Sequence, residues 1–167
     1  MNKIDCVAMT ILLAGSSVSD LYYYRIPNNL IVAGWLAGLV FRICNAGISG
    51  LGDGIFCIAA GIILLFPLYI VRGMGAGDIK LLSVVSGMYG LGFWMRTGVV
   101  FAVLAAMISI FRMIRKGLLV KRIRYFFHFI FGERAGAYYD AERDGRDMVI
   151  PLAPILAIAY YIVYFTE

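Results

Sequence analysis

The chain has 167 residues, of which 62% are hydrophobic, and its mean hydropathy is +0.88. A soluble domain is normally about half apolar, so this composition excludes the soluble class and indicates a protein of the lipid bilayer. The net charge of +5 does not predict nucleic-acid binding, because no basic and aromatic stripe lies in a soluble segment. In membrane proteins, Lys and Arg more often set the orientation of the chain.

The apolar stretches predict an all-α, polytopic membrane protein with about six transmembrane helices, since a spanning helix needs about 20 mostly apolar residues. The whole chain, residues 1–167, is expected to form a single integral membrane domain. The predicted spans lie near residues 5–24, 28–44, 54–72, 79–95, 97–114 and 148–165. The first of these also resembles a signal peptide, but its retention would place Tyr22 to Tyr24 in an interfacial aromatic belt.

The turns between the first spans carry the expected Pro, Asn and Gly residues. They are predicted at Ile26–Asn28, at Asn45–Gly54 and at Gly73–Asp78. Asp53, in the second of these turns, is expected to be the N-cap of the third span.

The basic residues predict the orientation, because Lys and Arg resist translocation across the membrane. Loops one, three and five carry most of them and are expected to face the cytoplasm, which places both termini outside. The residues concerned are Arg25, Arg72, Lys80, Arg112, Arg115, Lys116, Lys121, Arg122 and Arg124. The location is therefore predicted as the inner or plasma membrane.

The fifth loop, residues 115–147, mixes basic and aromatic residues and predicts an amphipathic interfacial helix before the last span. Its polar part, Glu133 to Asp147, is either a solvated segment or a docking site for a basic peptide. His128 lies among phenylalanines and is expected to be structural. The three cysteines have no zinc-binding spacing and are predicted to be buried apolar residues, so no metal site is expected.

Two aspartates occupy positions that a membrane protein normally avoids. Asp20 lies at the inner end of the first span and Asp78 at the start of the fourth. Both are predicted near the cytoplasmic face, where they are able to meet. Two carboxylates in a low-dielectric site share a proton, which is the arrangement of aspartic proteases: one activates a water and the other donates a hydrogen bond to the carbonyl oxygen. This chemistry requires no metal and no cofactor.

The residues around the aspartates resemble those of a known family. Gly75-Ala76-Gly77-Asp78 resembles the GxGD motif of intramembrane aspartyl peptidases, and Asp20 followed by Arg25-Ile26-Pro27-Asn28 resembles the first-aspartate motif of type IV prepilin peptidases. The similarity continues through Ile79-Lys80-Leu81 and, more weakly, through Ile150 to Pro154.

The resemblance implies an aspartic endopeptidase that removes the short basic leader of prepilins, pseudopilins or preflagellins at the cytoplasmic face, with Asp20 and Asp78 as the catalytic pair. Gly75, Gly77, Pro27, Asn28, Arg25 and Lys80 would support the pair. Larger family members carry an N-terminal CxxC segment and methylate the new N-terminus. Because this chain shows no such segment, it is expected to be a short form without methyltransferase activity.

Several alternatives remain open at this stage. Asp20 is alternatively an interfacial residue without a catalytic role, and Asp78 is alternatively the N-cap of a helix that starts at Ile79. Arg25 and Lys80 are alternatively charges at the membrane edge whose side chains snorkel to the interface. A proton-coupled transporter or channel also uses paired intramembrane carboxylates, although no internal repeat is present. Relatives of presenilin share the GxGD element, but their Pro-Ala-Leu motif is absent. The oligomeric state is not predicted.

Overall fold

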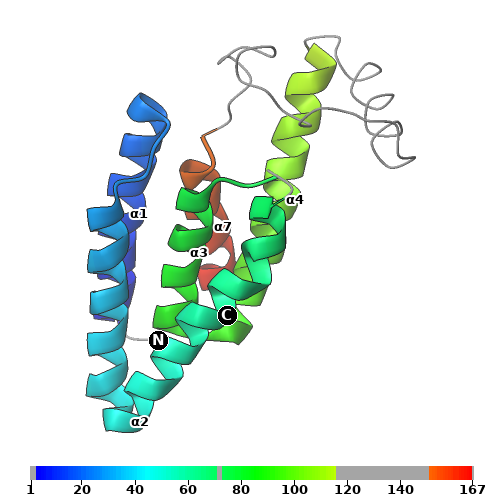
Figure 1. Ribbon diagram of the computed structural model, residues 1–167. Helices are drawn as coiled ribbons and strands as arrows, with labels where there is room; N and C mark the ends of the chain where they lie inside the picture. Colours follow the sequence, from blue (N-terminus) through cyan, green and yellow to red (C-terminus); the bar gives the residue numbers. More distant parts are fainter. Residues whose placement is uncertain (1–2, 71–72, 116–150, 167) are drawn as a thin grey trace. The chain divides into compact units, whose positions relative to one another are not determined.

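The computed structural model describes residues 3–70, 73–115 and 151–166 (Figure 1). All elements in these ranges are helices. They are α1 (Lys3–Tyr23), α2 (Asn28–Ile70), α3 (Ala76–Tyr89), α4 (Leu91–Arg115) and α7 (Ala153–Thr166). Three of them, α1, α2 and α4, are long and apolar enough to cross a membrane. The protein is thus an all-α membrane protein, while the predicted count of about six spans is not supported by helix length.

Helix α2 consists of two helical limbs, because its backbone reverses direction at Gly47. The φ angle of Gly47 is +66° and its ψ is −149°, values that are not helical. The limb after Gly47 turns back and diverges from the limb before it (Figure 1), and near the turn a Cβ placed on Gly54 would lie 2.8 Å from Leu39 Cδ2. Each limb is about 20 residues long, which is the length that a bilayer requires.

This hairpin corrects the predicted turn at Asn45–Gly54. The reversal takes place at Gly47, and the chain is helical again from Ile48 onward. Asp53 therefore lies exposed inside a helix and is not an N-cap. The glycines in this segment allow close approach of the two limbs: a Cβ on Gly50 would collide with the carbonyl oxygen of Arg42.

The middle of helix α3, from Leu81 to Gly87, is buried. Leu81, Ser83, Val84 and Val85 are completely buried. Both limbs of α2 pack against it through glycines, and side-chain hydrogen bonds accompany this packing. In the second limb, for example, the backbone carbonyl of Cys57 accepts a hydrogen bond of 2.8 Å from the Ser86 hydroxyl.

The boundary between α3 and α4 also differs from the prediction. The fourth span was expected to run to residue 95, but α3 ends at Tyr89 and Gly90, with a φ of +87°, redirects the chain into α4. Arg96 consequently lies inside α4 and not in a loop. This break is difficult to predict from the sequence, because a single glycine marks it and apolar residues lie on both sides of Gly90.

Helix α7 begins at Ala153, five residues after the predicted start of the last span at 148, and residues 148–150 are outside the described ranges. Pro154 lies in its first turn, where the missing N–H is not needed. The predicted interfacial helix, His128 and the polar segment 133–147 also lie outside the described residues. Among the cysteines, Cys57 is buried and Cys6 is half-buried, but Cys44 is exposed, so its predicted burial was wrong.

The chain divides into two compact units. One contains residues 1–102 and 151–167, and the other contains residues 103–150, of which the structure describes the end of α4. Within the first unit, α1 packs against α7 and α2, and α3 packs against α2 and α7. All of the candidate site residues belong to this first unit.

Candidate active site

Asp20 lies in the last turn of α1 and is 7% exposed. Its Oδ2 accepts a buried hydrogen bond of 3.0 Å from the backbone N–H of Ala153. Ala153 is the first residue of α7, so the positive end of that helix also points at the carboxylate. Asp20 is thus tied to the N-terminus of α7 through its carboxylate.

This contact with α7 was missed by the sequence reasoning. The segment from Ile150 to Pro154 was noticed only as a weak motif, and nothing in the sequence joins it to Asp20, which is 133 positions away. Pro154 was the available signal, since proline early in a helix marks an N-terminus with unsatisfied N–H groups.

Asp78 lies in the first turn of α3, outside the three long apolar helices. Its pKa is raised from 3.8 to about 7, mainly by burial and also by the nearby charge of Asp20, while a hydrogen bond from the backbone N–H of Gly75 opposes this rise. The two carboxylates are thus close enough to interact electrostatically, although they come from different helices.

The suggestion that Asp78 is an N-cap of a helix from Ile79 is wrong. Helix α3 starts at Ala76 with Gly75 as its N-cap, which makes Asp78 the third helical residue. From this position an acidic side chain reaches back to the N–H of the N-cap, as in a capping box. Asp78 therefore has a structural contact as well as its interaction with Asp20.

The two glycines of the GxGD-like motif, Gly75 and Gly77, have different neighbours. A Cβ on Gly75 would lie 2.9 Å from Asp78 Oδ2, so any other residue there would displace the carboxylate. A Cβ on Gly77 would lie 3.4 Å from Ile26 Cβ, an ordinary contact for a methyl group. Through Gly77 the second motif packs directly on the first.

The remaining motif residues join α1, α2 and α3 near the carboxylates. Lys80 Nζ donates a hydrogen bond of 3.2 Å to Asn28 Oδ1, which links the two motifs. The carbonyl of Arg25 accepts a bond of 2.8 Å from the Ser19 hydroxyl. Pro27 precedes α2, and its carbonyl accepts a bond from the N–H of Leu30, so it lies just before the first turn and not within it.

The described helices and the carboxylate pair define a class: a helical membrane protein in which two acidic side chains at helix ends interact electrostatically. The chain belongs to the type IV leader peptidase family, whose family model matches residues 6–114. This range contains both aspartates and ends before α7. No curated protein and no solved structure matches the chain.

Proposed function

We propose that the protein is an aspartic endopeptidase that removes the short basic leader from type IV prepilin-like, pseudopilin or preflagellin precursors at the cytoplasmic face of the membrane. The family match supports peptidase activity. The observation that carries the aspartic mechanism is the electrostatic interaction of the half-buried Asp78 with the buried Asp20.

The surroundings of the two carboxylates support distinct roles. Asp20, which accepts the N–H of Ala153, carries the negative charge and takes a proton from the attacking water. Asp78, whose raised pKa keeps about half of it protonated near pH 7 and most of it at lower pH, donates a hydrogen bond to the scissile carbonyl oxygen as negative charge develops there. The proton on Asp20 then passes to the leaving amine as the C–N bond breaks.

We also propose the membrane arrangement. The chain crosses the membrane six times in this arrangement. The six helical segments are the two limbs of α2 together with α1, α3, α4 and α7. The short α3 is enclosed by α2, which supplies its apolar surroundings. Arg25 and Lys80 flank the carboxylates and assign this end to the cytoplasm, with both termini outside.

The test is leader removal from prepilin-like precursors encoded in the same genome, co-expressed with the wild type, Asp20→Asn or Asp78→Asn and followed by mass spectrometry. We expect each substitution to reduce cleavage at least about 10³-fold, since each removes one member of a cooperating pair. Asp53→Asn, which changes an exposed carboxylate in α2, is the matched control and should cut normally.

Persistent cleavage by both Asn variants would overturn the aspartic mechanism. Ion flux in reconstituted vesicles that is lost in the same two variants, without any cleavage by the wild type, would instead establish a proton relay.

A further inference from the structure

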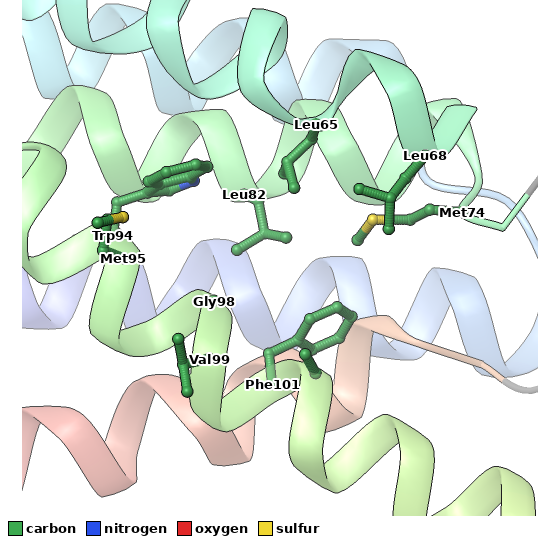
Figure 2. A pocket seen from close by; sticks show the side chains of 10 residues that line it. Leu65, Leu68, Met74, Leu82, Trp94, Met95, Gly98, Val99 and Phe101 are labelled. Atoms are coloured by element: carbon green, nitrogen blue, oxygen red, sulfur yellow. The ribbon is translucent and has the colours of Figure 1, made fainter. Parts of the chain in front are cut away.

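A groove of about 260 Å³ lies between the second limb of α2, α3 and the first part of α4. Figure 2 shows side chains from all three helices converging on this space. The residues that matter for its shape are Leu68, Met74, Leu82, Trp94, Gly98 and Phe101. All of them belong to the first compact unit.

The groove has a buried floor and an open rim. Leu82 is 1% exposed and Phe101 is 6% exposed, whereas Val99 on the rim is 64% exposed. Because α2 and α4 are both long and apolar enough to span a membrane, the proposed membrane arrangement puts this opening within the bilayer. An apolar segment is able to reach it from the lipid, but a charged leader is not.

The groove is linked to the candidate active site by one lining residue, Met74. Met74, which lines it, is buried and immediately precedes Gly75 in the chain. Gly75 in turn lies against the carboxylate of Asp78. A polypeptide whose scissile bond is at Asp78 therefore has the groove within reach of the residues next to that bond.

We propose that this groove binds the apolar residues that follow the scissile bond in the substrate, and so helps to determine which precursors are cut. The inference rests on the proposed peptidase function, in which the cut lies just before an apolar helix. The volume admits a few side chains and not a whole helix, so the substrate helix lies along the rim and inserts side chains toward Leu82 and Phe101.

Gly98 is the position where the substrate approaches most closely. A Cβ built on Gly98 would meet no atom within 4 Å, although the residue lines the groove. Within a bilayer, helices associate mainly through close packing, and small residues permit it. The position of Met74, in the groove and next to Gly75 in the chain, favours the substrate as occupant over a lipid acyl chain, which requires no connection to the candidate active site.

The same helix offers a matched control. Gly92 also has open space around its Cβ position but does not line the groove. Gly98→Leu and Gly92→Leu therefore add the same side chain to α4 at two positions where the Cβ atom meets no other atom. We expect Gly98→Leu to raise KM for a precursor at least tenfold with a smaller change in kcat, and Gly92→Leu to leave both unchanged.

A second measurement does not depend on turnover. A photo-crosslinking amino acid at Val99, on the rim, should form an adduct with the precursor in the Asp78→Asn background, while the same probe at the exposed Phe56 of α2 should not. This readout applies even if Gly98→Leu does not fold.

The outcomes separate the inference from the proposed function. The first outcome is cleavage by the wild type and not by Asp78→Asn, with an unchanged KM in Gly98→Leu and no adduct at Val99. It would overturn the proposed role of the groove and leave the proposed peptidase function in place. Loss of bound lipid from Gly98→Leu with unchanged KM would assign the groove to a lipid. Absence of wild-type cleavage, together with equal adducts at Val99 and Phe56, would overturn both.

Discussion

At the scale of single residues, the proposed aspartic mechanism depends on the different surroundings of two identical side chains, Asp20 and Asp78. Asp20 accepts a hydrogen bond from a backbone N–H of α7, while Asp78 is partly buried beside Gly75. In the proposed mechanism, Asp78 is therefore the protonated carboxyl group and Asp20 is the general base. The identities of both residues were apparent in the sequence, but this division of roles depends on Ala153.

A pH dependence of cleavage follows from the raised pKa of Asp78. A carboxyl group with a pKa of about 7 is protonated below that pH and ionised above it, so the required hydrogen-bond donor is lost as the pH rises through 7. We expect kcat/KM for a precursor in detergent to fall about tenfold for each pH unit well above 7.

The control for this pH profile is Asp53→Asn, which should show the same alkaline limb as the wild type. A constant kcat/KM from pH 6 to pH 9 would contradict the assignment of Asp78 as the proton donor.

At the scale of elements, glycines control how closely the helices approach. A Cβ on Gly34, in the first limb of α2, would collide with Leu12 Cδ1 of α1 and lie 2.7 Å from Val84 Cγ1 of α3. Leu12 has flexible torsions, but Val84 is β-branched and buried in α3, so it has little freedom to move. Gly34 therefore sets the spacing of the helices that carry Asp20 and Asp78.

Gly34→Ala should consequently destabilise the protein by about 1–3 kcal/mol, the usual cost of overpacking a core. Gly52→Ala is the control in the same helix, because nothing lies within 4 Å of its Cβ position. It should be neutral or stabilising by up to about 1 kcal/mol through helix propensity. Thermal unfolding in detergent gives both values, and equal midpoints for the two variants would rule out the packing argument.

At the scale of the whole molecule, the reversal at Gly47 decides how the chain crosses the membrane. If both limbs of α2 cross, Ile48 lies on the opposite side of the bilayer from Tyr23, at the end of α1, and Gly73, before α3. All three positions are exposed, with Ile48 at 87%. The proposed orientation places Ile48 outside and the other two in the cytoplasm.

Single cysteines at these positions test the arrangement in a background where Cys6, Cys44 and Cys57 are replaced. In intact cells, a membrane-impermeant maleimide should label Ile48→Cys, whereas Tyr23→Cys and Gly73→Cys should react only after permeabilisation. Labelling of all three from one side would show that α2 does not cross twice.

The sequence alone determined the class of this protein and the residues of the candidate site. Apolar length identifies a membrane protein because the bilayer demands long apolar helices, and an aspartate beside such a helix is costly enough to be noticed. The two motifs were recognisable because each is local in the chain. Helix boundaries were less accessible, since the breaks at Gly47 and Gly90 depend on one backbone conformation each.

Only the tertiary structure decided how the distant segments meet. The hydrogen bond from Ala153 to Asp20, the contact of Gly77 with Ile26 and the groove beside Met74 join positions that are far apart in sequence. Such contacts depend on how helices pack, and apolar residues on every face of a membrane helix give little indication of which face meets which neighbour. The pKa of Asp78 is likewise a property of burial and of Asp20, and not of the residue itself.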